Sequence, residues 1–592
     1  MWLVTLESVQ NFLIGKTSKY LSEKLKTEVR IDHVHLGFFN KFNISGVYVE
    51  DLQQDTLLYV GNLSIKSTDL LKTVVWKNKA IIKSIELDDI FVHLYRAHDT
   101  TYWNYDFIAE AFGVDIDRTD TTTKTIEETK KSENTNSHSG PSIGLEKVKL
   151  NNVRFYMDDA WRGEDLRFSI GELDLKSKKL DLTSNQMFID YLGIDKADVT
   201  VLEYEGGKPE DLTPDDTTSW GTPFNPDNFA LVANRIKLTE SSFQYHVGTD
   251  LPLIGEFDED HIEVSELFLD LENTRIVADT IFSDLQWLHA KERCGLTIED
   301  LHANIKLSQV QAQLSEMALK TKHSYLADFF EMDYKNFHAY EDFLEGVTLV
   351  TKLSQSKISS LDIAYFAPIL REYPITVDID AVASGKIGDI NVRDIELKTL
   401  NSHFKGHSTI VGLPDIDEAR FSVLIDQLQT NGKDINQLVP QTKTSAVDWN
   451  TISSIKYSGQ FSGRAMDFET KGMLATNMGN IDMNMKMNFY PLVPTYSGFV
   501  KSDGIQLGNF LKNRSLGSIA LESSIDGQGF DLADLNTKVN TKIKHINFDG
   551  NNYKDLYING FIAKRKFDGI FVSHDPNLAV NFDGKIDLSG KV

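Results

Sequence analysis

Cysteine is almost absent from this chain of 592 residues, in which Cys294 is the single one. A lone cysteine excludes an intrachain disulfide and a cysteine-based metal cluster. Proline is scarce as well, with 13 residues, which favours long uninterrupted strands over loops punctuated by proline. The composition fits a reducing compartment, and it equally fits an envelope protein that is stable without crosslinks.

Long apolar runs and surplus positive charge are also missing. No stretch reaches the roughly 18–20 consecutive apolar residues of a membrane-spanning helix, and the start of the chain lacks the features of a complete signal peptide. The formal net charge is −26, with 87 acidic and 61 basic residues. This charge argues against nucleic acid as a partner, because phosphate binding needs an excess of Lys and Arg. It argues equally against simple electrostatic adhesion to anionic lipid headgroups.

Recognisable catalytic motifs are absent from the sequence. It contains no G-x-S-x-G nucleophile elbow, no phosphate-binding loop with G-K-[ST], no H-E-x-x-H and no G-x-G-x-x-G. We therefore expect no enzyme, no cofactor and no metal site.

Alternation of apolar and polar residues is what the chain has in abundance. The stretch 147–159, KVKLNNVRFYMDD, places an apolar side chain at nearly every second position. Such a period of two predicts a strand with one apolar and one polar face. Similar stretches recur along almost the whole chain, so the sequence predicts a mainly β protein.

One apolar spacing recurs with a three-residue step in its middle. Its four copies are Ile85-Leu87-Ile90-Val92-Leu94, Val148-Leu150-Val153-Phe155-Met157, Ile236-Leu238-Ser241-Phe243-Tyr245 and Ile395-Leu397-Leu400-Ser402-Phe404. The step requires a bulge or corner if both halves are to stay on one face. Copies of this sort indicate an array of strands in which each contacts its neighbours.

Helical segments are few and short. A helix is predicted for residues 9–25 and a turn of helix for 105–113, while 325–371 has a partly helical pattern. The sequence predicts six segments: an N-terminal amphipathic helix (1–27), a first β-domain (28–113), a disordered Thr/Ser-rich loop (114–142), β-repeats (143–324), a partly helical interruption (325–374) and further β-repeats (375–592).

Three arrangements could cover the apolar face of so many strands. Two sheets could stack as a sandwich or solenoid, helices could lie over one sheet, or one sheet could curve around a ligand. The helices are too few for the second arrangement, and the residues alone leave the other two open. The fold we favour is an elongated, repetitive antiparallel sheet curled into a U-shaped, taco-like hydrophobic groove, with short N-terminal and mid-chain helices.

Four stretches carry a resemblance to a known family. They are residues 9–65 (VQNFLIGKTSKYLSEKL… to …DTLLYVGNLSI), SLDIAYFAPIL (360–370), TIVGLPDID (409–417) and HDPNLAVNFDGKIDLSGK (574–591). In these stretches the chain resembles the TamB members of the AsmA-like superfamily, the translocation and assembly modules, in the form found in Bacteroidetes-type bacteria. These landmarks are structural and not catalytic.

The resemblance implies a periplasmic protein of a Gram-negative cell envelope, anchored in the inner membrane through its N-terminal segment. It implies support of phospholipid transport to the outer membrane, and of protein assembly or secretion there, with an outer-membrane barrel of the Omp85 type as a partner. By the same resemblance, residues 1–27 are expected to be the remnant of a membrane-anchor region, and the β-repeats are expected to be incomplete at the C-terminus.

The expected ligands are phospholipid acyl chains that slide along the apolar interior of the groove. The main alternative is a structural or adhesive β-repeat protein of the envelope without lipid cargo, and a carbohydrate-active enzyme ranks third. The side chains predicted to line the groove are Ile85, Leu87, Val92, Val148, Leu150, Phe155, Met157, Ile395, Leu397 and Phe404.

Overall fold

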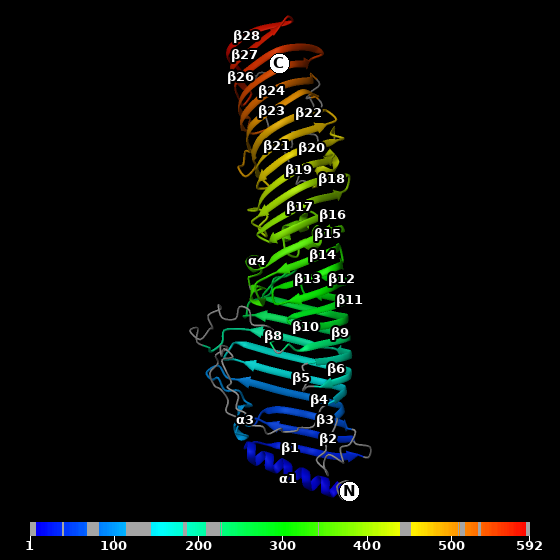
Figure 1. Ribbon diagram of the computed structural model, residues 1–592. Coiled ribbons are helices and arrows are strands. Elements are labelled where there is room, and N and C mark those ends of the chain that lie inside the picture. The colour runs from blue at the N-terminus through cyan, green and yellow to red at the C-terminus, as the bar shows by residue number, and fades with distance from the viewer. Residues whose placement is uncertain are drawn as a thin grey trace, which may run out of the picture. The chain divides into compact units, whose positions relative to one another are not determined.

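The structure is a computed structural model, and the part of the chain that it describes is mainly β, with 28 strands in one largely antiparallel sheet and few short helices (Figure 1). The alternation of apolar and polar residues accounts for these strands, because it gives each of them one face for packing and one for solvent. The residues described are 7–37, 41–67, 82–113, 144–181, 186–208, 225–226, 228–340, 342–438, 451–506, 508, 515–530 and 534–587.

The chain divides into two compact units, which are described separately. Unit 1 comprises Met1–Lys322 with Tyr334–Phe337, and unit 2 comprises His323–Asp333 with His338–Val592. The strands of unit 1 are β1 (Val29–Gly37), β2 (Lys41–Glu50), β3 (Thr56–Ser67), β4 (Ile82–Arg96), β5 (Gly144–Asp159), β6 (Glu164–Asp181), β7 (Gln186–Asp195), β8 (Asp198–Glu203), β9 (Ala230–Val247), β10 (His261–Val277), β11 (Thr280–Glu292), β12 (Thr297–Ser308) and β13 (Gln311–Thr321).

Unit 2 is a simple meander in which each strand pairs antiparallel with the next. Its strands are β14 (Tyr325–Asp333), β15 (Thr348–Ser359), β16 (Thr376–Lys386), β17 (Asp389–Thr399), β18 (Ser402–Val411), β19 (Arg420–Thr430), β20 (Ile455–Gly463), β21 (Asp467–Thr476), β22 (Gly479–Asn488), β23 (Thr495–Gln506), β24 (Leu516–Gln528), β25 (Asn536–Phe548), β26 (Asn551–Ala563), β27 (Lys566–Asp575) and β28 (Leu578–Asp587).

The short helices lie at the ends of the sheet or in its connections. In unit 1, α1 packs along β1, and the predicted turn of helix at 105–113 is confirmed as α3. The helices are α1 (Glu7–Leu25), α3 (Asp106–Ala111), η3 (Phe337–Tyr340), α4 (Phe343–Gly346), α5 (Ser360–Ile363), η4 (Pro368–Glu372) and α6 (Gly432–Leu438).

Two positions in unit 1 depart from the expected antiparallel pattern. Strand β5 pairs with β4 in parallel, and β9 pairs in parallel with both β7 and β8. Strands β7 and β8 also both pair with β6, so they act as one interrupted strand. A parallel neighbour requires a crossover connection, and the long polar segments of the sequence before β5 and before β9 provide the chain for it.

The bulge expected at the three-residue step is confirmed in the first three copies of the repeated spacing. The step residues Asp89, Asn152 and Glu240 have left-handed backbone, with φ of 54°, 51° and 47°. In the parallel pair β4–β5 the two bulges coincide, and the Asn152 side-chain amide donates to Asp89 Oδ1 at 2.7 Å. Asn and Asp tolerate this conformation well, and the extra residue lets the strand bend while its apolar residues stay on one face.

The fourth copy of the spacing is not a single strand. Ile395 and Leu397 belong to β17, Leu400 lies in the turn with φ of 52°, and Ser402 and Phe404 begin β18. The spacing matched because a tight hairpin turn also interrupts an alternating pattern. Strand β17 does contain a bulge, but it lies before Ile395, at Asp394, whose backbone is left-handed.

Two further predicted segments can be compared with the structure. The interruption at 325–374 contains strands β14 and β15 in addition to η3, α4, α5 and η4, because SYLADFFEMD alternates well enough to join the sheet. The predicted disordered loop, 114–142, lies outside the described residues.

Candidate functional site

A row of aliphatic side chains crosses the strands of unit 1 on the apolar face. Each member lies opposite the next in the strand register, from β1 to β13. We call this set the leucine row: Val34, Ile44, Leu63, Leu87, Leu150, Leu173, Ile194, Leu238, Leu269, Leu288, Leu301 and Leu319. Neighbouring strands are about 4.8 Å apart, so the hydrocarbon along the row is continuous.

A second row runs parallel to the first, two residues away along each strand except β11, where Leu285 and Leu288 are three residues apart. Its members are also paired in register and are all apolar. This second row comprises Phe42, Ile65, Ile85, Val148, Leu175, Leu192, Ile236, Leu271, Leu285 and Ala303.

The side chains of the leucine row are half-buried, although they lie in the middle of long strands. By contrast, Leu285 and Ala303 at one end of the second row are buried, with 4% and 6% exposure. Leucines enclosed by a second packed layer would have the low exposure of Leu285 along the entire row. The cover over the leucine row is therefore incomplete.

Seven of the predicted groove residues come together on this face. Strands β4 and β5 place Ile85 beside Val148, Leu87 beside Leu150 and Val92 beside Phe155, while Met157 lies beside Leu94. All are half-buried, and the Phe155 ring stacks on Phe168 of β6 at 5.0 Å between centroids. The first two pairs belong to the two rows, and the other two lie beyond the bulge.

The other three predicted residues belong to unit 2. Leu397 of β17 pairs with Phe404 of β18, and Ile395 pairs with Gly406. The Phe404 ring lies close over Gly406, where an added Cβ would come within 3.1 Å of Cζ. All three predicted side chains are half-buried on the apolar face of their strands.

The apolar face of unit 2 is less uniform than that of unit 1. Small and hydroxylated residues interrupt its rows, as in the cross-strand pairs Gly459–Gly472 and Gly560–Gly569. Within this face the hydroxyls of Ser523 and Thr541 are buried and bond each other at 2.7 Å. A shorter apolar row nevertheless crosses β16 to β22 of unit 2, and it comprises Ile379, Leu397, Phe404, Leu428, Tyr457, Leu474 and Ile481.

Unit 2 also has a compact aliphatic cluster along one end of its strands. Helix α6 contributes Ile435 to the edge of this cluster. The buried members are Ile452, Ile455, Met478, Ile505, Ile519, Ile543 and Leu556.

The opposite face of the strands is polar, and its charges are largely paired. Glu396, between Ile395 and Leu397 in sequence, bonds Lys398 at 2.7 Å, Lys405 at 2.9 Å and His403 at 2.9 Å. These hydrogen bonds, above all the two from the lysines, lower the pKa of Glu396 to about 2. On β4, hydrogen bonds from Asn62 and Asn151 lower the pKa of the Asp88 carboxyl. The alternation thus separates a hydrocarbon face from a hydrated, ion-paired one.

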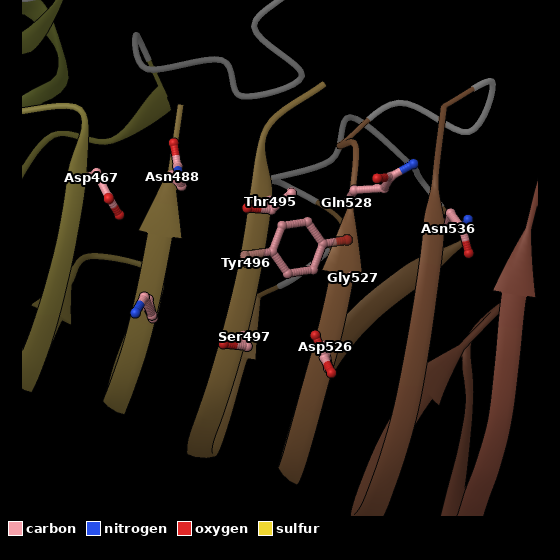
Figure 2. A pocket seen from close by; sticks show the side chains of 10 residues that line it. Asp467, Asn488, Thr495, Tyr496, Ser497, Asp526, Gly527, Gln528 and Asn536 are labelled. Carbon is pink, nitrogen blue, oxygen red and sulfur yellow. The ribbon is translucent and has the colours of Figure 1, made fainter. Parts of the chain in front are cut away.

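Three hollows in the described surface lie on the polar face, and none of the predicted groove residues lines them. Two of them adjoin in unit 2, with volumes of about 550 and 410 Å³, and both are lined by Asp467 and Lys486. Figure 2 shows the larger one, which is lined by residues of β21 to β25. A smaller hollow of about 140 Å³ lies in unit 1 beside Tyr191 and Gly193.

Most members of the leucine row were not predicted. Alternation identified apolar positions within each strand, but the alignment of Leu63, Leu173 or Leu301 with Leu87 depends on the register between strands. Register is set by turns and bulges, and a shift of one residue would move a strand's apolar set to the other face.

Among the described residues, no group of three or more His, Cys, Asp or Glu side chains is placed to hold a metal ion, and no helix has the length and hydrophobicity to cross a membrane. No family model matches the chain, and no match was found among curated proteins or solved structures.

Proposed function

We propose that this protein carries phospholipid acyl chains along the apolar face of its sheet, between the two membranes of a bacterial envelope. The observation that carries the proposal is the leucine row, which is continuous over the strands of unit 1 and only half-buried. Covering the exposed part of one such side chain contributes about 1 kcal/mol of binding free energy. Covering all the side chains of the leucine row would therefore contribute on the order of 10 kcal/mol, before the entropic cost of association is subtracted.

The proposed shape is a groove in which the sheet curls around its apolar face. The left-handed bulges at Asp89, Asn152 and Glu240 support curvature, because a bulge bends its strand and strengthens the twist. In such a groove acyl chains would lie across the strands, along the rows. The headgroups would stay in water.

The resemblance to the TamB members of the AsmA-like superfamily supports the same function and rests on the four stretches quoted above. It adds the proposed setting: a periplasmic protein held at the inner membrane, with an Omp85-type barrel as its outer-membrane partner. The mechanism we propose is passive, and the driving energy would come from another component.

A photo-crosslinking amino acid at position 150 tests the proposal directly. The protein would be expressed in a Gram-negative host, illuminated in intact cells, purified, and its adducts analysed for phospholipid by mass spectrometry. We expect phospholipid adducts at Leu150, because its side chain belongs to the half-buried row. The matched control is Lys149, the preceding residue of the same strand, whose side chain is on the polar face and bonds Glu172 at 3.1 Å.

Equal lipid yield at positions 149 and 150 would count against the proposal, because it would indicate adventitious contact with membranes. Absence of lipid at 150, with crosslinks to protein segments in its place, would favour the alternative of a structural or adhesive β-repeat protein. In that case another protein layer covers the row.

A further inference from the structure

Three connections at one end of the strands of unit 2 together carry an apolar patch. They are the connections β20–β21, β22–β23 and β24–β25. The strand register brings them side by side, because Asn488 of β22 pairs with Asp467 of β21 and with Thr495 of β23, and Thr495 pairs in turn with Gln528 of β24. We call five apolar residues of these connections the rim patch: Met466, Phe489, Tyr490, Leu492 and Phe530.

The rim patch is exposed and contiguous. Leu492 is fully exposed, and Met466, Tyr490 and Phe530 are about half exposed. The backbone N–H of Phe489 donates to Met466 O at 2.7 Å, and the rings of Phe489 and Phe530 stack with 6.2 Å between their centroids. Single exposed apolar residues are normal on a protein surface, whereas a contiguous set of them is typical of a contact site.

The segment 489–494, FYPLVP, holds Leu492 in a fixed position. Two prolines restrict its backbone, and the Tyr490 hydroxyl donates to Asp417 O at 3.0 Å. At the other end of the segment, the Gly529 N–H donates to Pro494 O at 2.9 Å. A segment that is already fixed at both ends loses little conformational entropy when it binds a partner.

A stack of aromatic rings connects the rim patch with the apolar face of unit 2. The Phe489 ring lies 6.2 Å from that of Phe468, which lies 4.8 Å from that of Phe461. Phe461 and Phe468 lie on the apolar face of β20 and β21, the face that also holds the Gly459–Gly472 pair. Hydrocarbon therefore continues from this face around the end of the strands to the exposed segment.

The charges around the rim patch favour an uncharged partner surface. Segment 489–494 contains no charged residue, and the nearby Arg464 is paired with Glu418 at 2.7 Å. A partner whose binding site is ringed by charges would find no complement here. A bilayer with neutral headgroups does fit, because aromatic rings favour the headgroup level and aliphatic side chains the hydrocarbon below it. Leu492 is the most exposed residue of the patch, and the Tyr490 and Phe530 rings are half exposed, which matches this layering.

We propose that the rim patch docks unit 2 on the surface of a phospholipid bilayer with neutral headgroups. Leu492 enters the edge of the hydrocarbon layer, and Tyr490 and Phe530 lie at the level of the headgroups. The inference rests on the proposed lipid function, because the ring stack then gives acyl chains a continuous apolar path between the bilayer and the sheet. A single segment gives weak and reversible binding, so docking requires millimolar lipid.

A fluorescent label at position 492 tests the docking. The full chain with Leu492→Cys is labelled with the environment-sensitive dye NBD and mixed with phosphatidylcholine vesicles, with and without a nitroxide-labelled lipid. Cys294 does not compete for the dye, because it is buried and burial raises its pKa to about 11. We expect the vesicles to raise the fluorescence about twofold or more, and the nitroxide lipid to quench this gain.

The matched control is the same label at Leu400→Cys. Leu400 is 59% exposed in the β17–β18 turn, at the other end of the strands, and should show no gain. In the chain labelled at 492, the further substitution Tyr490→Asp places a charge in the interface. It should raise the lipid concentration for half the gain about tenfold. Circular dichroism verifies that the labelled chains are folded.

The inference is overturned if millimolar lipid leaves the label at 492 unchanged, if the label at 400 gains equally, or if Tyr490→Asp has no effect. It is also overturned if a periplasmic extract shifts the label at 492 and vesicles do not, because the patch then docks a protein. Phospholipid adducts at Leu150 alongside any of these results would leave the proposed lipid function standing, so the two failures are distinguishable.

Discussion

At the scale of single residues, a buried ion pair fixes one end of strands β4 and β5. Arg96 and Asp159 are 4% and 3% exposed, and they form two hydrogen bonds, Nε to Oδ1 at 2.5 Å and Nη2 to Oδ2 at 2.6 Å. The guanidinium lies between the Trp103 and Trp161 rings, 4.9 and 4.6 Å from their centroids. Trp103 comes from the loop before α3, so the stack ties that loop to the sheet.

We predict that Asp159→Ala lowers the free energy of unfolding by about 3–5 kcal/mol, because it removes the buried carboxylate that pairs with the Arg96 guanidinium. Guanidinium titration followed by tryptophan fluorescence measures the change. The control is Glu86→Ala, which removes an exposed pair with Lys147 at 3.9 Å and should change stability by less than about 1 kcal/mol. Similar effects of the two substitutions would mean that the pair is hydrated in solution.

At the scale of elements, helix α6 depends on one carboxylate. Asp434 is 3% exposed and accepts hydrogen bonds from the backbone N–H of Asn401 at 2.8 Å and from the Ser402 hydroxyl at 2.7 Å. These bonds join α6 to the β17–β18 turn. A helix of seven residues is not stable by itself, so its attachment holds Ile435 against the aliphatic cluster.

Asp434→Ala should therefore lower the stability of unit 2 by about 2–3 kcal/mol, as measured by urea titration followed by far-UV circular dichroism. Hydrogen bonds from Ser402, Asn401 and Asn431 outweigh the effect of burial and lower the pKa of Asp434 below its ordinary value of 3.8. Because the pKa of Asp434 is lower in the folded than in the unfolded protein, its carboxylate contributes its full stabilisation at pH values above the unfolded pKa. This stabilisation is lost as the pH falls through the folded pKa. Wild type and variant should thus differ most above about pH 4 and converge below it.

The exposed Asp426 of β19 provides the control for this helix. Its carboxylate lies 3.5 Å from His407 Nε2 in an exposed contact, and Asp426→Ala should have little effect at any pH. An equal loss in both variants would contradict a specific role for Asp434.

Elements were predictable from the sequence to the extent that they depend on local pattern. Alternation identified the strand that holds Val148 to Met157, and the three-residue step identified the bulge at Asn152. The parallel partner of that strand could not be predicted, because it depends on how a long polar connection crosses the sheet. The same applies to the leucine row, which exists only once twelve strands are in register.

At the scale of the whole molecule, a mainly β chain with few helices followed directly from the pattern of apolar residues. The groove-lining role assigned to Phe155 or Leu397 remains a prediction, because it concerns a ligand. Charge was informative in a different way: the chain has a net charge of −26, and the two apolar rows of unit 1 contain no charged residue. An acidic surface on a protein with exposed hydrocarbon opposes self-association.

A sheet in which the extensive contacts of each described strand are with its paired neighbours should not unfold all at once. Six of the seven tryptophans precede residue 323, so fluorescence reports mainly on unit 1, whereas far-UV circular dichroism reports on every strand. We predict that the two signals give different denaturation midpoints. Asp159→Ala should lower the midpoint of the fluorescence transition, which reports on unit 1. Asp434→Ala should lower the midpoint of the part of the dichroism transition that belongs to unit 2 and leave the fluorescence midpoint unchanged. If both signals coincided and shifted together in both variants, the chain would unfold as one cooperative body, and local pairing of strands would not describe its energetics.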